Sequence, residues 1–422
     1  MKARYIIPAC ACALGVFFGT FIHRRAPDYY PDRSYFQALG DLLCTCEFLS
    51  KQTQSFASNR WWSYSMLTMT SKFVAQFKKP PSNITIHEVK FDDFDSVLLI
   101  PDEFKKRNKP GPLIVFFHGG GWVFGSTASY MNVLVSTAKE TGFAVMATEY
   151  RLAPTHPFPI PFEDCLHSVL SVMKDANKYN VDPSQIVIAG DSAGGNLALS
   201  VTLEIIKMHE KDESIYLPKM LALVYPVVQM VNFQLPSYKA YFNHTVCSEM
   251  VPKAWLSYLG FHDNLELASV MMNNAHIDYD DDEKQFQAEC VDASLIPSEY
   301  TIANIEEYPE PYPYSSIEVE LEWKNKIKKM AFDPRIAPLM SSDEVLSKLM
   351  RTHIMISNYD QLRDEGLILA KRLEKIGVDV TLQFLPDSPH ATLNIGALVK
   401  SSYHNTQNSI FNQHIKSYIE RN

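Results

Sequence analysis

A serine stands at the centre of a short glycine motif, Gly190-Asp191-Ser192-Ala193-Gly194, that directly follows the apolar run 185–189. A strand that turns sharply into a helix projects such a serine hydroxyl above the edge of a sheet, and the tight turn needs small residues two positions before and after it. The helix that follows adds partial positive charge behind the hydroxyl. We therefore interpret Ser192 as a nucleophile, since an ordinary glycine turn fits the flanking strand and helix less well.

A second glycine motif, His118-Gly119-Gly120-Gly121-Trp122, directly follows the apolar run 113–117. Successive glycines let backbone N–H groups converge on one oxygen, which in an enzyme of this kind is the anion of a tetrahedral intermediate. We expect His118, Gly119, Gly120 and Gly121 to build an oxyanion hole together with the Ala193 N–H, with His118 shaping the loop rather than transferring protons. The sequence does not single out the donating glycine. A phosphate-binding loop is disfavoured because neither G-K-S/T nor G-x-G-x-x-G is present.

A serine nucleophile needs a base, and the base needs an acid to orient it, in the chain order serine, acid, histidine. Asp360 lies just past the apolar run 352–357, at the sheet edge where open α/β sheets bind their ligands. We assign Asp360 as the acid. Asp364, four residues further on, is interpreted as a helix-dipole and capping partner.

The candidate base is His390, at the end of a predicted loop, 385–389, that follows the apolar run 378–384. The two later histidines, His404 and His414, fall in or near the predicted terminal helix. A histidine just past the last strand, in the right chain order, fits the role of a base better than they do.

Short apolar runs alternate with longer helical stretches along most of the chain. Runs typical of strands cover 84–100, 113–117, 143–150, 185–190, 220–226, 352–357 and 378–384, and helical stretches cover 128–140, 162–179, 194–210 and 362–376. This alternation predicts a mostly parallel, doubly wound α/β sheet. It breaks between about 232 and 330, where we expect an inserted lid.

The N-terminus carries an apolar run of 18 residues from Tyr5 to Ile22. Its length is near the lower limit for a bilayer span, and bulky residues fill the region where a signal peptide has its small-residue cleavage site. We therefore predict a signal-anchor segment over 1–25, a helical lid region over 26–82 and a catalytic domain over 83–422. Both flanks of the run are basic, so charge alone leaves the orientation open.

Two sequons, at Asn83 and Asn243, are candidate glycosylation sites and favour a lumenal body, although chance sequons are common in a chain this long. Seven cysteines in 422 residues are too few for a disulfide framework. Five of them lie outside the predicted anchor and could form at most two pairs, which the sequence leaves open.

Composition excludes several classes of protein. Hydrophobic residues make up 46% of the 422 residues, enough for a sizeable core, and the net charge of −9 argues against nucleic acid as a partner. Asp278, Asp280, Asp282 and Glu289 match ligand positions of an EF-hand loop, but Glu283 stands where that loop needs glycine. We interpret the cluster as a solvated acidic loop and expect no metal.

The motifs together resemble the hormone-sensitive-lipase family of α/β-hydrolases, and within it the membrane esterases similar to arylacetamide deacetylase and neutral cholesterol ester hydrolase. The matching stretches are HGGGW, YRLAPTHPFPIPFEDC, GDSAGGNLA and YDQLRDEG, and the resemblance covers roughly residues 84–420 and the N-terminal anchor. It implies an α/β-hydrolase fold with a helical lid, with Asp360 and His390 as triad acid and base. Two departures are Ala391-Thr392, where the family often has glycine, and a long insertion over 266–330.

These observations predict a serine hydrolase that cleaves apolar carboxylic esters through an acyl-enzyme and needs no cofactor. An amidase or deacetylase uses the same residues, and a non-catalytic ligand-binding protein on this fold is a further alternative. The expected partners are an apolar ester or amide and, through the anchor, a membrane. We expect a single-pass type II protein of the endoplasmic reticulum with a lumenal catalytic domain; secretion or the plasma membrane is the alternative.

Overall fold

The computed structural model describes residues 81–241, 249–307, 317–394 and 402–421. The predicted anchor over 1–25, nearly all of the region 26–82, and Asn243 lie outside these residues. Within the described part of the chain, no helix combines the length and the apolar character that a membrane span requires.

One eight-stranded sheet organises the described residues, in the order β1-β2-β4-β3-β5-β6-β7-β8. Its strands are β1 (Ile84–Lys90), β2 (Asp95–Pro101), β3 (Gly111–Phe117), β4 (Ala144–Glu149), β5 (Val181–Asp191), β6 (Met220–Val224), β7 (Thr352–Tyr359) and β8 (Val380–Pro389). The pairs β1–β2 and β2–β4 are antiparallel, and all the other neighbours are parallel. The predicted mostly parallel sheet is therefore confirmed.

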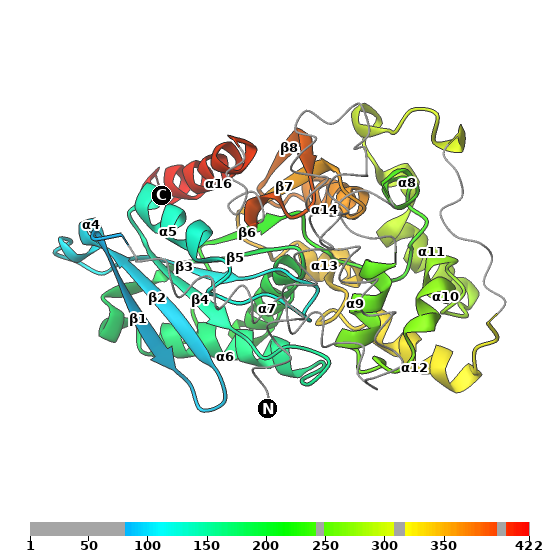
Figure 1. Cartoon of the computed structure of the whole chain (residues 1–422), viewed down its shortest axis with the longest axis horizontal. Coiled ribbons are helices and arrows are strands. Elements are labelled where there is room, and N and C mark those ends of the chain that lie inside the picture. The colour runs from blue at the N-terminus through cyan, green and yellow to red at the C-terminus, as the bar shows by residue number, and fades with distance from the viewer. Residues whose placement is uncertain (1–80, 242–248, 308–316, 395–401, 422) are drawn as a thin grey trace, which may run out of the picture.

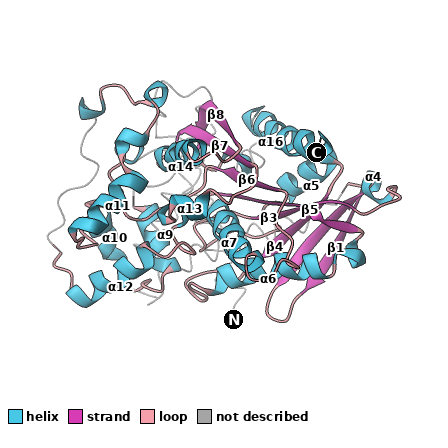
Figure 2. Ribbon diagram, turned by 180° about the vertical axis from the view of Figure 1, so that it is seen from behind, coloured by secondary structure: helices cyan, strands magenta, loops and turns pink. Residues whose placement is uncertain are grey.

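Helices cover both faces of the sheet, as Figures 1 and 2 show. On one face, α5 (Met131–Thr141) and α16 (Ser402–Arg421) pack against alternate strand residues such as Ile114 and Phe116. On the other face, α6 (Ile160–Lys174), α7 (Ala193–His209) and α14 (Arg363–Lys375) pack against a second set that includes Val115. Since every residue of β3 is buried, this strand is apolar throughout rather than alternating.

Several element boundaries differ from the sequence predictions. The stretch 84–100 forms a hairpin of two strands, preceding the short helix α4 (Asp102–Lys105). The stretch 162–179 is broken at Asp175 into α6 and a 3₁₀ turn, η2 (Ala176–Tyr179). The predicted loop 385–389 is strand, because β8 keeps pairing with β7 as far as Tyr359 opposite Pro389.

Between β6 and β7, the residues that the structure describes form helices rather than strands, as the broken alternation predicted. They include α8 (Pro236–Ala240), α9 (Met250–Tyr258), α10 (Ala268–Met272), α11 (Asp281–Val291), α12 (Leu321–Ala331), α13 (Asp343–Leu346) and short 3₁₀ turns. Figure 1 shows most of these helices gathered at one end of the sheet. The Ser237 hydroxyl of α8 donates to the Gln361 carbonyl just after β7 (2.7 Å), so α8 lies at the carboxyl end of the parallel strands.

The acidic cluster was interpreted from the sequence as a loop, but the structure places Asp282 and Glu289 in helix α11, which Asp280 precedes. The Asp280 carboxylate accepts the Glu283 backbone N–H, and the Glu283 carboxylate accepts the Asp280 N–H (both 2.9 Å). This reciprocal pair is a capping box, which stabilises the first turn of a helix. The described residues contain no group of three acidic, histidine or cysteine side chains that could hold a metal ion.

Candidate active site

Ser192 lies at a strained turn between β5 and α7. Its backbone has a φ of 54°, a left-handed conformation that non-glycine residues rarely adopt. The turn is tight, because a Cβ at Gly190 would overlap the Gly194 carbonyl oxygen, and one at Gly194 would overlap that of Phe117. The predicted strand–turn–helix geometry and the need for glycine on both sides of Ser192 are confirmed.

The three side chains proposed for catalysis meet at the carboxyl ends of β5, β7 and β8. Ser192 Oγ lies 2.9 Å from His390 Nε2, and His390 Nδ1 lies 2.7 Å from Asp360 Oδ2. Asp360 and His390 are 1% and 6% exposed, so water does not compete for these bonds. An Nδ1–H that donates to Asp360 leaves Nε2 as an acceptor for the Ser192 hydroxyl, which is the arrangement a general base requires.

The loop after β7 fixes the orientation of Asp360. Its second carboxylate oxygen, Oδ1, accepts the Leu362 backbone N–H (2.9 Å). Asp364 lies in the first turn of α14, as predicted, but it caps a different helix. Its carboxylate accepts the Ser237 N–H at the start of α8 (2.7 Å) and pairs with Arg363 (2.9 Å). Asp364 therefore ties the loop that carries Asp360 to the helical segment after β6.

Glu365, the next residue, is a buried acid that the sequence analysis did not single out. Its carboxylate accepts the Val228 and Gln229 N–H groups (2.7 and 3.0 Å) and the Tyr238 hydroxyl (3.0 Å). Burial raises its pKa to about 8, against the opposing effect of these donors. The side chain thereby joins α14 to the segment that follows β6.

A backbone turn and an aromatic ring hold His390 in place. The Tyr225 ring lies 4.7 Å from the imidazole, centroid to centroid, and its hydroxyl accepts the Leu393 N–H (3.0 Å). Ala391 has a φ of 63°. Glycine adopts this conformation without strain, which explains physically why the related family often has glycine at this position.

The glycine loop after β3 uses its first amide to bind the protein itself. The Gly119 N–H donates to Asp191 Oδ1 (2.8 Å) and also lies 3.1 Å from the Tyr130 hydroxyl oxygen. Gly119 is therefore not available as an oxyanion donor, and the loop amides that remain are those of Gly120 and Gly121. Both glycines have positive φ, 118° and 58°. The sequence had left the choice of donor open.

His118 is packed within this loop, which fits the predicted role of shaping it. It is 2% exposed, and its Nδ1 lies 2.8 Å from the Gly119 carbonyl oxygen. The Tyr150 ring stacks on the imidazole at 4.4 Å, and its hydroxyl donates to the His118 carbonyl (2.6 Å). At the other end of the loop, Trp122 packs against Trp255 of α9, with ring centroids 4.4 Å apart.

Sequence reasoning missed the residues that support the site from behind. They are Asp191, Tyr130, Tyr150, Tyr225 and Glu365. The sequence could have indicated Asp191, because the tight turn does not require an acid directly beside the nucleophilic serine. Nothing in the sequence indicated the tyrosines, since their contacts join residues that are distant in the chain.

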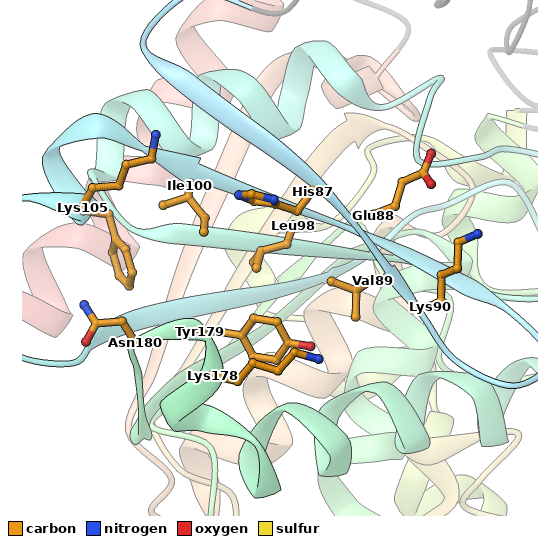
Figure 3. A pocket seen from close by; sticks show the side chains of 11 residues that line it. His87, Glu88, Val89, Lys90, Leu98, Ile100, Lys105, Lys178, Tyr179 and Asn180 are labelled. Carbon is orange, nitrogen blue, oxygen red and sulfur yellow. The ribbon is translucent and has the colours of Figure 1, made fainter.

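A groove of about 700 Å³ lies away from this site (Figure 3). It is lined by β1 and β2, including His87 and Leu98, and by Lys178 and Tyr179 of η2. Since η2 precedes β5 and Ser192 follows it, the groove and the triad lie at opposite ends of that strand. The groove is therefore not the site at which Ser192 would meet a substrate.

The remaining predictions concern surface and redox chemistry. Asn83 is exposed in the turn before β1, a position open to modification. Cys165 and Cys290, the two cysteines in the described part of the chain, are buried and form no disulfide. Burial raises the pKa of both thiols, to about 11 for Cys290. Neither has the character of a reactive thiolate.

Three relatives are similar over most of the chain. Arylacetamide deacetylase from Mus musculus is 33% identical over 339 residues, covering 78% of this chain and 81% of the relative. Neutral cholesterol ester hydrolase 1 from Bos taurus is 32% identical over 363 residues, covering 81% and 85%. Arylacetamide deacetylase-like 2 from Homo sapiens is 30% identical over 391 residues, covering 91% and 92%.

The family model described as alpha/beta hydrolase fold matches residues 114–281 and 294–394. Two solved structures share the fold: a fungal esterase from Rhizomucor miehei (TM-score 0.61, 22% identity, 89% of this chain and 95% of that one) and a thermostable esterase from Pseudomonas putida (TM-score 0.60, 18% identity, 89% and 96%). The chain therefore belongs to the α/β-hydrolase family of carboxylic ester hydrolases. The relatives also confirm the resemblance to arylacetamide deacetylase and neutral cholesterol ester hydrolase.

Proposed function

We propose that Ser192, His390 and Asp360 form the catalytic triad of this hydrolase and that it cleaves apolar carboxylic esters through an acyl-enzyme. The observation that carries the proposal is the unbroken hydrogen-bond chain from Ser192 Oγ through the imidazole to Asp360 (2.9 and 2.7 Å). Ser192 and Asp360 are 168 residues apart in the chain, and Asp360 and His390 are 30 apart. The fold, rather than a local motif, therefore brings the three side chains together.

In the first half of the reaction, Ser192 Oγ attacks the ester carbonyl carbon while His390 Nε2 takes the hydroxyl proton. The carbonyl oxygen becomes an anion, and the N–H groups of Gly120, Gly121 and Ala193 are the proposed donors to it. Losing one such donor typically costs about 3–4 kcal/mol of transition-state stabilisation. His390 then returns the proton to the departing alcohol, which leaves an acyl group on Ser192.

In the second half, water attacks the acyl carbon and His390 takes a proton from it. The second tetrahedral intermediate collapses, the carboxylic acid leaves, and Ser192 regains its proton. Asp360 stays ionised throughout and stabilises the imidazolium that forms twice in the cycle.

Amide cleavage is the second candidate activity, because relatives of this chain include arylacetamide deacetylase as well as neutral cholesterol ester hydrolase. The triad serves both reactions, and an amide differs in that His390 must protonate a poorer leaving group. A matched pair of substrates separates the two: one acyl group carried once as a phenyl ester and once as an anilide. A higher kcat/KM for the ester supports the esterase proposal, and a higher value for the anilide supports a deacetylase.

The chain would be held at the lumenal face of the endoplasmic reticulum by the N-terminal apolar segment, and an anchored body suits a substrate that partitions into the bilayer. The sequons support this orientation, and Asn83 is exposed. Glycosidase treatment of the chain from secretory cells tests it. A mobility shift that Asn83→Gln and Asn243→Gln together abolish supports a lumenal body, whereas protease cleavage of the body in sealed microsomes contradicts it.

The proposed activity is tested with p-nitrophenyl esters, from acetyl to palmitoyl, on the full-length chain in detergent. Ser192→Ala removes the nucleophile and is expected to lower kcat by roughly 10⁴-fold or more. Asp164→Asn, which removes a buried acid that is paired with Arg151 away from the triad, serves as a control for folding. A folded wild-type chain that hydrolyses none of these esters would leave the non-catalytic binding protein as the better account.

A further inference from the structure

Asp191 is a buried carboxylate directly beside the proposed nucleophile. It is 1% exposed, and both of its oxygens are engaged: Oδ1 accepts the Gly119 N–H and Oδ2 accepts the Tyr130 hydroxyl, each at 2.8 Å. Gly119 begins the oxyanion loop, and Tyr130 directly precedes the first residue of α5. One side chain therefore joins the turn that carries Ser192, the oxyanion loop, and a helix on one face of the sheet.

The contact between Asp191 and the loop is close. A Cβ at Gly119 would lie 2.7 Å from Asp191 Oδ2 and 2.9 Å from the Asp191 carbonyl oxygen, so only glycine allows the loop to approach this near. The bond from the Gly119 N–H to Asp191 fixes the orientation of the peptide group at which the loop begins. That orientation in turn limits the directions in which the next two N–H groups, those of Gly120 and Gly121, can point.

The chemical type of residue 191 indicates that charge matters as well as shape. An asparagine here could accept the Gly119 N–H and donate to Tyr130 without placing a charge in the interior. Burial of the carboxylate is costly, and it raises the pKa of Asp191 to about 6, although Tyr130, Gly119 and His390 act in the opposite direction. The titratable groups that face Asp191 are Tyr130, Tyr150 and His390. Of these, His390 is the one that becomes cationic during the reaction.

We propose that Asp191 is a positioning residue that holds the oxyanion loop in register with Ser192, and that its negative charge adds to that of Asp360 in stabilising the imidazolium of His390. This inference rests on the proposed function, because it assigns a task within that catalytic site. It goes beyond the triad by naming a second acid and by excluding Gly119 as an oxyanion donor.

Two variants separate geometry from charge. Asp191→Asn keeps both hydrogen bonds and removes the charge, whereas Tyr130→Phe keeps the charge and removes one hydrogen bond. Two controls match them. Asp164→Asn removes a buried acid that pairs with Arg151 (2.7 Å), and Tyr258→Phe removes a buried hydroxyl that has no hydrogen-bond partner among the described residues.

Each full-length variant is assayed for kcat and KM on a p-nitrophenyl ester and for inhibition by an alkyl trifluoromethyl ketone. Ser192 adds to this ketone, and the resulting oxyanion occupies the same site as that of the reaction. We expect Asp191→Asn to lower kcat by about 10- to 100-fold and Tyr130→Phe by about 3- to 10-fold, with little change in KM. The Ki of the ketone should rise in proportion to the loss of kcat/KM. The controls should change thermal stability without changing kcat.

Ester hydrolysis by the wild-type chain tests the proposed function first. Failure of the proposed function can therefore be distinguished from failure of the role assigned to Asp191. An active wild type whose Asp191→Asn and Tyr130→Phe variants keep its kcat and its Ki overturns the role of Asp191 alone. The same holds if kcat falls while the Ki of the ketone stays constant, because a positioned oxyanion loop must affect both. Should Asp191→Asn fold poorly, Tyr130→Phe decides the question by the same two readouts.

Discussion

At the scale of single residues, the backbone next to His390 is under strain. Ala391 has a φ of 63°, a conformation that costs an L-residue roughly 1–2 kcal/mol. The strain is retained because the neighbouring side chains fix the turn: the Ser388 hydroxyl lies 2.8 Å from that of Thr392 and accepts a hydrogen bond from Gln407 (2.6 Å). The orientation of the His390 imidazole thus depends on a turn whose backbone conformation is unfavourable for alanine at position 391.

Substitutions at Ala391 test this account of the turn. Ala391→Gly should be within about 1 kcal/mol of wild type in the free energy of unfolding, since relief of strain and the greater freedom of the unfolded chain oppose each other. Ala391→Val should lose about 2 kcal/mol or more, because a β-branched residue tolerates this conformation poorly. Urea unfolding measures both, and kcat reports whether His390 has moved. A valine variant as stable and active as the glycine variant would contradict the account.

At the scale of elements, the turn between β5 and α7 depends on close backbone approach. A side chain at Gly194 would collide with the Phe117 carbonyl at the end of β3, which is a neighbouring strand rather than part of the turn. The nucleophile is therefore positioned by the contact between the start of α7 and the end of β3. The helix α7 cannot shift without breaking this contact.

Gly194→Ala is accordingly expected to abolish activity and to lower the free energy of unfolding by several kcal/mol. Each strained or overpacked feature typically costs roughly 1–3 kcal/mol. Gly366→Ala is the matched control. Its Cβ would meet the flexible end of Ile356 at 3.1 Å at the end of the first turn of α14, where alanine favours the helix. Thermal unfolding and ester hydrolysis measure both variants. Equal effects of the two substitutions would show that the turn is not specially constrained.

Most strands and the order of the catalytic residues could be predicted from the sequence, whereas one strand end and one loop contact could not. The apolar runs predicted the buried strands because parallel strands are covered on both faces, and chain order predicted Ser192, Asp360 and His390. The end of β8 was misplaced, since Pro386 and Pro389 indicate a loop, whereas β8 stays paired with β7 as far as Pro389 opposite Tyr359. The contact of Gly119 with Asp191 joins residues 72 apart, and no local pattern encodes it.

At the scale of the whole molecule, two buried histidines make stability depend on pH. Burial lowers the pKa of His276 to about 4, and its Nε2–H is bound to the Met230 carbonyl (2.8 Å). Burial, with His414 and Arg351 nearby, lowers the pKa of His353 to about 3. His353 stacks on His414 at 4.2 Å, joining β7 to α16. Both histidines are neutral in the folded chain at pH 5, whereas they are protonated in the unfolded chain below about pH 6.5.

Because the unfolded chain binds more protons at these two histidines, their contribution to stability should fall as the pH drops below about 6.5. Each histidine contributes a loss of about 2 kcal/mol between pH 7 and pH 5. Glu365 and Asp191, whose pKa values burial raises to about 8 and about 6, act in the opposite direction over that range, so a variant isolates the effect better than the wild-type curve. In urea unfolding, the stability of His353→Phe at pH 5, relative to its stability at pH 7, should be about 2 kcal/mol higher than the same difference in wild type. An unchanged pH dependence in this variant would contradict the prediction.

The most direct test of the central claim is covalent labelling of the full-length chain with a fluorophosphonate, followed by peptide mass spectrometry. Such a probe phosphonylates a serine only where a neighbouring base activates it. The account predicts a single adduct on Ser192 in the wild-type chain, strongly slowed labelling in His390→Ala, and none at that position in Ser192→Ala. A folded wild-type chain that stays unlabelled, or an adduct on another serine, would contradict it.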